Sequence, residues 1–271
     1  MSDATGFFER GWVAFPPDPV TEAWADAARP LAEEIFTDPG ERAAWLRCGD
    51  TWFAGVNVFP NDDRGAVPDR GVPPLAGPVV DFVRETLRLD GFAWDRAQIS
   101  VCLPGYPQPW DGESEAAFRF RRDRDAAHVD GLLRDEARRR RLGEVHGFIL
   151  GLPLTEVPED AAPLVVWEGS HTSMREAFRA RFAGVAPMDW AAEDITDAYT
   201  EARRAVFSKC RRVAVTVPCG GAYLVHRLAL HGVAPWGPRG GADPRSIAYF
   251  RPDTGAREEF PDDPSWWLED P

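Results

Sequence analysis

From about residue 96 onwards, the chain consists of short apolar segments separated by glycine, proline and aspartate. The segments are AQISVCLPGY, VHGFILGLPLT, APLVVW, CRRVAVTVPCGGAYLVH, LALHGVAPW and RSIAYFRP. Several short apolar or β-branched runs bounded by turn-forming residues are typical of a β-sandwich or barrel. We therefore expect a mainly β core over 96–260. One segment, at about 172–208, has helical character and is expected to be an insertion.

The first 95 residues follow a different pattern. GWVAF at 11–15 and TWFAGVNVF at 51–59 are expected to be strands. Between them, apolar side chains recur every three or four residues from Val20 to Ile35, which predicts a helix that Pro30 should kink or split. PVVDFVRETLRL repeats the helical spacing. We expect this N-terminal part to support the β core, so that residues 1–271 form a single domain.

Composition excludes some classes of function. The chain has 31 basic and 44 acidic side chains and a formal charge of -13, which argues against binding nucleic acid through its phosphates. No apolar stretch approaches the ~20 residues of a membrane span, and the N-terminus lacks the pattern of a signal peptide. The four cysteines form no C-x-x-C pair, as expected of reduced thiols. We expect a cytoplasmic protein without nucleic-acid or membrane partners.

All five histidines lie in the strand-rich part of the chain. His128 and Asp130 occupy alternate positions in the stretch RDAAHVDGLL. If that stretch is extended, both side chains point to one face, where an imidazole and a carboxylate can share a cation. Taken alone the H-x-D pair is a weak motif, and a solvated pair in a charged loop is the alternative.

Two further residues extend the H-x-D pair into a pattern. His231 ends an apolar run just before a glycine, and Arg245 opens the next apolar strand. Alone, the first could be a core histidine and the second a surface arginine. Two histidines and one carboxylate on one face of a metal form the facial triad of non-haem Fe(II) oxygenases, and a guanidinium can clamp a carboxylate with two hydrogen bonds. H-x-D, a distant histidine and then an arginine is the order expected of a 2-oxoglutarate-dependent oxygenase.

At this point the sequence resembles the phytanoyl-CoA dioxygenase family of Fe(II)/2-oxoglutarate oxygenases. The resemblance is carried, in order, by FFERGWVAFPPDPVTEAWADAARPLAEEIF, HVDG, LTEVPEDAAPLVVWEGSH, GGAYLVHRLALHGVAPW and RSIAYFRP. It implies a double-stranded β-helix, also called a jelly roll. It implies that His128, Asp130 and His231 bind catalytic Fe(II), and that Arg245 pairs with the distal carboxylate of 2-oxoglutarate. With O2 as the oxidant, it implies hydroxylation or a related oxidation of a small organic molecule, with succinate and CO2 as coproducts.

The sequence departs from the family pattern where relatives often have a serine that helps to hold the cosubstrate. That position is Val233 here, and Ser246 or Tyr223 is a possible replacement. The upstream strand offers Gln98 as a further cosubstrate ligand, with Ser100 as its alternative. Trp236 could line the substrate pocket, although core packing is the more frequent role of tryptophan.

Two other functions remain open at this stage. One is a jelly-roll metal-binding protein without turnover, which Val233 favours. The other is a cupin-type metalloenzyme that does not use 2-oxoglutarate. The direction of Arg245 separates them from the leading hypothesis, because a cosubstrate clamp must face the metal cavity and not solvent.

Overall fold

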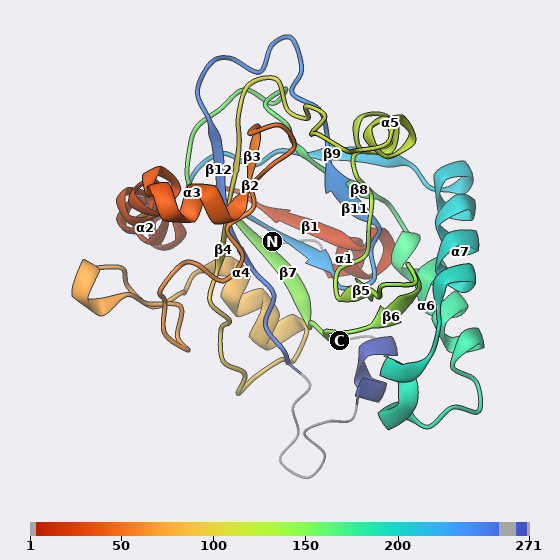
Figure 1. Cartoon of the computed structure of the whole chain (residues 1–271). Helices are drawn as coiled ribbons and strands as arrows, with labels where there is room; N and C mark the ends of the chain where they lie inside the picture. The colour runs from red at the N-terminus through yellow and green to blue at the C-terminus, as the bar shows by residue number, and fades with distance from the viewer. Residues whose placement is uncertain (1–3, 255–263, 270–271) are drawn as a thin grey trace.

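The computed structural model describes residues 4–254 and 264–269, and the last part of the expected β core, 255–260, lies outside them. Two antiparallel sheets dominate this part of the chain (Figure 1). The large sheet has seven strands in the order β1 (Trp12–Phe15), β10 (Ala222–His226), β7 (Phe148–Pro153), β12 (Arg245–Phe250), β4 (Gln98–Cys102), β3 (Trp52–Phe53) and β2 (Leu46–Arg47). The small sheet has the order β11 (His231–Val233), β8 (Leu164–Trp167) and β9 (Arg212–Val215).

The chain passes repeatedly between the two sheets. It runs from β7 in the large sheet to β8 and β9 in the small sheet, returns to the large sheet at β10, enters the small sheet at β11 and ends in the large sheet at β12. A bridge between His128 and His231 adds the segment before β5 to the edge of the small sheet. This is the connectivity of a double-stranded β-helix, so the expected mainly β jelly-roll fold is confirmed.

Side chains at alternate strand positions fill the space between the sheets. On β12, Ile247 and Tyr249 face inward, whereas Ala248 and Phe250 face outward. The inner cluster is completed by side chains from both sheets and the turn after β10: Ile149, Leu164, Val166, Val215, Tyr223, Val225 and Ala229. Four of these side chains, Ile149, Leu164, Val225 and Tyr249, also line a cavity in this interior.

Helices cover the outer face of the large sheet. They are α1 (Ala4–Arg10), α2 (Pro19–Thr37), α3 (Pro39–Trp45) and α4 (Pro78–Asp81), which continues as a π-helical turn over Phe82–Thr86. Asp18 caps α2 by accepting hydrogen bonds from the backbone of Val20 and Thr21. Trp24 of α2 packs edge-on against Phe250, with ring centroids 5.7 Å apart.

The split expected at Pro30 is wrong, because α2 runs through this residue as one helix. Trp24, Ala28 and Leu31 are buried on both sides of the proline. Burial of this apolar stripe against the sheet outweighs the loss of one backbone hydrogen bond.

Two helices lie between β8 and β9, where the insertion was expected. They are α6 (Ser170–Arg181) and α7 (Thr196–Lys209), joined through a 3-10 turn over Pro187–Ala192. Their apolar residues Met174, Phe178 and Tyr199 are fully buried in one cluster with Trp167 of β8. The helical insertion is therefore confirmed, and it covers one side of the small sheet (Figure 1).

The remaining elements are short. The 3-10 turns Pro68–Arg70 and Pro264–Leu268, the helix α5 (Glu115–Asp123) and the hairpin of β5 (Leu132–Arg134) and β6 (Arg140–Leu142) complete the described residues. The strand expected over 51–59 is mostly wrong, because only Trp52–Phe53 pairs in the sheet. Asn57 adopts a left-handed backbone conformation, with φ 56°, which a continuous strand does not allow. Among the described residues, none of the helices is long and apolar enough to cross a membrane.

Candidate metal centre

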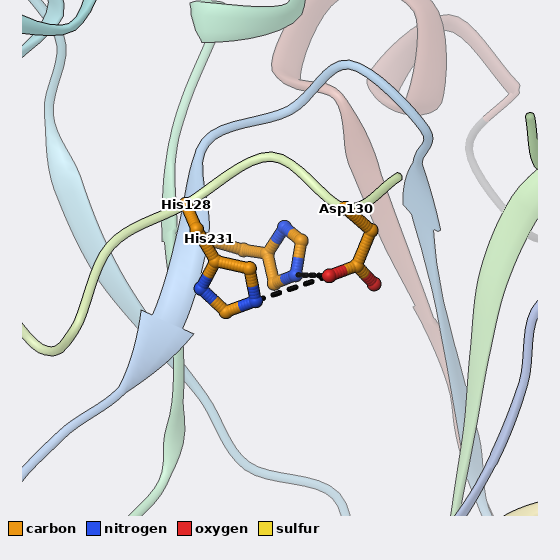
Figure 2. A group of neighbouring side chains, drawn as sticks. All are labelled: His128, Asp130 and His231. Carbon is orange, nitrogen blue, oxygen red and sulfur yellow. Dashed lines mark ion pairs between the residues drawn. The ribbon is translucent and has the colours of Figure 1, made fainter. Parts of the chain in front are cut away.

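The two metal motifs meet through a backbone bridge. The His128 N–H donates to the His231 carbonyl at 2.8 Å, and the His231 N–H donates to the His128 carbonyl at 3.0 Å. This antiparallel pairing places the two imidazole centroids 4.6 Å apart. Figure 2 shows both rings and the carboxylate of Asp130 turned toward one another. One potential ligand atom from each of the three residues lies within 4.8 Å of the others.

Each histidine ring is fixed by its own turn. Nδ1 of His128 lies 2.9 Å from the carbonyl oxygen of Ala126, and Nδ1 of His231 lies 2.9 Å from that of Ala229. A carbonyl oxygen only accepts, so both Nδ1 atoms carry a proton and donate it. In the neutral rings, both Nε2 atoms then keep a free lone pair, which is the form that binds metals.

Both Nε2 atoms face the same oxygen of Asp130. The distances to Oδ1 are 3.0 Å from His128 and 3.7 Å from His231. Two lone pairs against an anionic oxygen repel one another unless a cation lies among them. A shared proton or a divalent metal ion satisfies all three atoms, and two imidazoles with one carboxylate are a ligand set suited to Fe(II). The residues therefore fit the metal that the family resemblance implies.

The charges of the cluster alter its protonation. Burial opposes ionisation of Asp130, but the Arg251 guanidinium and both imidazoles outweigh it and hold the pKa of this carboxyl well below its usual range. Loss of water around the His128 ring opposes its charge, yet the hydrogen bond that the protonated ring donates from Nε2 to Asp130 raises its pKa. Asp130 is therefore a carboxylate over the whole physiological pH range, as a metal ligand must be.

Sequence reasoning missed Arg251, whose Nε lies 2.5 Å from Oδ2 of Asp130. The strand register contains a signal for it. Arg245, Ile247, Tyr249 and Arg251 occupy alternate positions along and just beyond β12, so all four share the inward face.

Asp95 was also missed, His146 was weighed only as a ligand in an E-x-H pair with Glu144, and both residues hold the backbone of Arg251. Asp95 Oδ1 accepts from the Arg251 N–H at 2.8 Å, and His146 Nδ1 donates to the Arg251 carbonyl at 3.1 Å. Burial raises the pKa of Asp95 to about 6 despite the hydrogen bond from Arg251. Burial lowers the pKa of His146, which keeps this ring neutral. Asp95 belongs to no recognisable motif, and the E-x-H pair of Glu144 and His146 was set aside because nothing downstream completes it.

The cluster of His128, Asp130 and His231 opens into a cavity of about 410 Å³, here called the metal cavity. Its lining mixes polar and apolar side chains. It includes Trp52, Val56, Asn57, Asp95, Gln98, Ser100, Glu144, His146, Ile149, Leu164, Val225, Val233, Tyr249 and Arg251 beside the three cluster residues. A cavity of this size holds a small molecule.

Arg245 lies inside the sandwich and only 5% of its surface is exposed. It does not line the metal cavity. It lines a neighbouring cavity of about 300 Å³, and Tyr249, which does line the metal cavity, accepts a long hydrogen bond from its Nη2 at 3.4 Å. Tyr223 lines the second cavity and donates to Tyr249 at 2.8 Å. Tyr249 thus lies between the metal cavity and the Arg245 guanidinium.

No carboxylate neutralises Arg245 within the described part of the chain. Its Nη1 is buried and has no hydrogen-bond partner there. Burial raises the pKa of neighbouring Cys102 to about 11, although Arg245 opposes this, so that thiol stays neutral. Burial also raises the pKa of Tyr223 well above its usual value. A buried guanidinium without an anion is costly, and an anionic ligand would remove that cost.

The other residues considered as cosubstrate ligands lie on different faces of the large sheet. Gln98 lines the metal cavity and is paired with Tyr249 in the sheet, although its amide already donates to the Ala54 carbonyl at 2.8 Å. Ser100 also lines the cavity and accepts from Trp52 Nε1 at 3.0 Å. Ser246 is not brought to the site, because it alternates with Arg245 and lines a cavity on the outer face of the sheet.

Trp236 is not brought to the metal cavity either. It is partly buried against a cluster of Cys48, Cys102, Tyr106 and Ala162. Val233, at the position where a hydroxyl was expected from the resemblance, does line the metal cavity.

The arginine run at 138–141 forms the turn and second strand of the β5–β6 hairpin. Arg139 and Arg141 both pair with Asp135 across this hairpin. Arg140 lies over the ring of Tyr199, 4.8 Å from its centroid. These contacts bind the hairpin together and to α7, and none of these arginines lines the metal cavity.

Gly232 allows the two metal motifs to approach one another. A Cβ atom here would collide with the carbonyl oxygen of Asp125, whose carboxylate is held by Arg212 at 2.6 and 2.7 Å. We predict that Gly232→Ala pushes the His128 segment away from His231. Unfolding in denaturant should show a loss of about 1–3 kcal/mol, typical of overpacking. Titration with Co(II) should show weaker binding, and native affinity in this variant would contradict the close approach.

No protein-family model matches the sequence, and no curated protein matches it. Among solved structures, the chain is similar to SnoK, a non-heme α-ketoglutarate-dependent carbocyclase from nogalamycin biosynthesis. The identity is 16%, the match covers 92% of this chain and 83% of SnoK, and the TM-score is 0.48. EctD from S. alaskensis with bound Fe is similar at 16% identity, with 91% and 74% covered and a TM-score of 0.48.

A third similar structure is HygX from Streptomyces hygroscopicus with nickel, 2-oxoglutarate and hygromycin B bound. Its identity is 13%, with 90% of this chain and 83% of HygX covered and a TM-score of 0.44. Because the identities do not exceed 16% and these TM-scores are below 0.5, the activity of this chain has to be argued from its own residues.

Proposed function

We propose that the protein is an Fe(II)- and 2-oxoglutarate-dependent dioxygenase that hydroxylates or otherwise oxidises a small organic molecule. One observation carries the proposal. The interior of a single β-sandwich contains a cluster of two histidines and a carboxylate. It also contains, on the inward face of the large sheet, a buried arginine without a carboxylate partner among the described residues. A metal ion would be a ligand partner for the cluster. A dicarboxylic keto acid could chelate that metal with one end and pair with the arginine through its other carboxylate.

The metal would be held by Nε2 of His128, Nε2 of His231 and a carboxylate oxygen of Asp130. Two neutral imidazoles and one anion leave a divalent ion with coordination positions for exogenous ligands. Those positions would face the cavity of about 410 Å³, which these three residues help to line.

Arg245 would pair with the distal carboxylate of 2-oxoglutarate. Its Nη1, which has no hydrogen-bond partner within residues 4–254 and 264–269, supplies one donor. A bidentate pair is the strongest arrangement for a guanidinium and a carboxylate. Tyr249 contacts Arg245 and lines the metal cavity, so its hydroxyl, supported by Tyr223, would take the role of the hydroxyl that Val233 lacks. Gln98 is a weaker candidate, since its amide donates elsewhere.

Bound iron supplies the coupling of O2 reduction to oxidation of the keto acid and of the substrate. In this overall reaction 2-oxoglutarate, O2 and R–H give succinate, CO2 and R–OH. The residues of the chain would bind and orient the reactants, keep Asp130 ionised and exclude bulk water from the sandwich interior.

The substrate would bind in the metal cavity, which Trp236 does not line. The described cysteines, Cys48, Cys102, Cys210 and Cys219, are all free, which supports a reducing, cytoplasmic location. We further propose that residues 1–271 act as a single oxygenase domain.

A cupin-type metalloenzyme that does not use 2-oxoglutarate is the second candidate. It is favoured by the position of Arg245, which lines the neighbouring cavity and not the metal cavity. This candidate requires that Tyr223 and Tyr249 keep the two cavities apart.

Formation of succinate tests the proposal. Wild-type protein with Fe(II), ascorbate, O2 and 2-oxoglutarate should release succinate slowly without substrate and faster with a true substrate from a screen of small molecules. Asp130→Ala protein should give only background. Substrate oxidation without succinate would support the second candidate and contradict the proposed function.

A further inference from the structure

We propose that Arg251 is a positioning residue of the metal centre, which holds Asp130 so that only one of its oxygens, Oδ1, is offered to the metal. This inference rests on the metal site of the proposed function, but it does not require 2-oxoglutarate. It assigns a role to an arginine to which the sequence resemblance gives none.

The two oxygens of Asp130 are used differently. Oδ1 lies 3.0 Å from His128 Nε2 and 3.7 Å from His231 Nε2, so it faces the centre of the cluster. Oδ2 accepts a charge-assisted hydrogen bond from Arg251 Nε at 2.5 Å. Because Oδ2 is already bound, a metal ion that takes Oδ1 does not readily take both oxygens.

Arg251 is itself held on three sides. Asp95 accepts from its backbone N–H, and His146 donates to its carbonyl oxygen. Its guanidinium carbon lies 5.4 Å from the centroid of the Tyr249 ring. Three residues of the cavity wall thus fix the arginine, and the arginine fixes the carboxylate. Partners behind a metal ligand of this kind usually set its orientation and the affinity of the site.

The contact is more than a surface ion pair. The side chain of Arg251 is 20% exposed and that of Asp130 is 13% exposed, so water screens their attraction weakly. Asp130 also meets two potential metal ligands on its other side. An ion pair that only stabilised the fold would not need its acidic member to point into a three-residue cluster.

The consequence concerns the number of open positions on the metal. If Asp130 bound through both oxygens, it would occupy a position that an exogenous ligand needs. Binding through one oxygen preserves the open side required for a chelating keto acid and O2. Arg251 would therefore act on coordination number as well as on affinity.

The test uses Co(II) alone as the probe, titrated into the metal-free full-length protein in the absence of 2-oxoglutarate. We expect Arg251→Met to weaken Co(II) binding about 10- to 100-fold. We also expect its visible absorption to weaken per bound ion, because d–d bands lose intensity as coordination number rises. Arg251→Lys should recover part of the affinity, since it restores the charge without the planar fork. Arg204→Met, on the exposed side of α7, is the matched control and should match the wild type.

A double-mutant cycle separates positioning from a general structural role. If Arg251 acts through Asp130, Arg251→Met should cause no further loss of Co(II) affinity in an Asp130→Ala background. Equal losses in both backgrounds would overturn the proposal, as would wild-type affinity and spectrum in Arg251→Met. Circular dichroism of each variant checks that the fold is retained. If Arg251→Met does not fold, Arg251→Lys replaces it in the same double-mutant cycle.

The two proposals fail in different ways. Co(II) binding that depends on Arg251, combined with no response to 2-oxoglutarate, would sink the oxygenase and leave the role of Arg251 intact. If Arg251→Met protein kept native Co(II) affinity and responded normally to 2-oxoglutarate, the role of Arg251 would be overturned and the oxygenase proposal would stand. No Co(II) binding by the wild type would overturn both.

Discussion

Asp130→Ala should lower the affinity for Fe(II) or Co(II) at least about 100-fold, equivalent to about 2.7 kcal/mol. Asp130 is the only anion among the three clustered residues, and its Oδ1 is the atom that both histidines face. Its loss removes the charge that compensates a divalent ion. It also leaves the largely buried Arg251 unpaired, which should reduce the free energy of unfolding by about 2 kcal/mol, below the range for fully buried pairs.

Isothermal titration and chemical denaturation measure these two effects separately. Asp135→Ala is the matched control, because Asp135 is a nearby carboxylate that pairs with Arg139 and Arg141 outside the metal cavity. It should bind metal like the wild type. Native metal affinity in Asp130→Ala would show that the cluster is an ordinary group of polar residues that binds no metal.

Arg245→Met should weaken binding of 2-oxoglutarate about 30-fold or more, because truncating one partner of a buried charge pair typically costs about 2–5 kcal/mol. Fe(II) binding should stay unchanged, since Arg245 contacts none of the three clustered residues. The same substitution should not destabilise the protein without 2-oxoglutarate. It removes a buried cation that has no carboxylate partner in the described residues, and an apolar side chain there is neutral or stabilising.

Ser246→Ala is the control for Arg245. Ser246 is the next residue on β12 but faces a cavity on the outer side of the sheet, so its loss should leave 2-oxoglutarate binding unchanged. Native 2-oxoglutarate affinity in Arg245→Met, together with a large drop in stability, would indicate that Arg245 has a structural role and would favour the cupin-type alternative.

The alternation of side chains along strands explains which parts of the site were predictable. His128 and Asp130 occupy alternate positions, so the sequence alone indicated that they share a face. That they meet His231 depends on a backbone bridge between segments about a hundred residues apart, and only the family resemblance anticipated it. Periodicity does not determine which distant strands pair.

The same alternation could have excluded Ser246 and identified Arg251. Once Arg245 is taken to face inward, Ser246 must face outward and Arg251 inward. The cosubstrate role of Ser246 was considered for its hydroxyl and not for its position. Arg251 lies in RSIAYFRP, a segment that carried the resemblance, but only Arg245 of that segment was given a role.

Other parts of the fold were outside the reach of local patterns. The helical insertion was visible because α6 and α7 bury one apolar stripe each over several turns. In contrast, 51–59 has the composition of a strand, yet only Trp52–Phe53 pairs with the sheet. Tertiary contacts decide such short segments, as they decide that α2 continues through Pro30.

The central claim is that one sandwich interior binds Fe(II) and 2-oxoglutarate together. The most direct measurement is an anaerobic titration of metal-free wild-type protein with Fe(II) and then with 2-oxoglutarate, recorded in the visible range. We predict the charge-transfer band of a keto acid chelated to iron, weaker at the same concentrations in both Asp130→Ala and Arg245→Met. Iron bound to the wild type without any such band would contradict the claim.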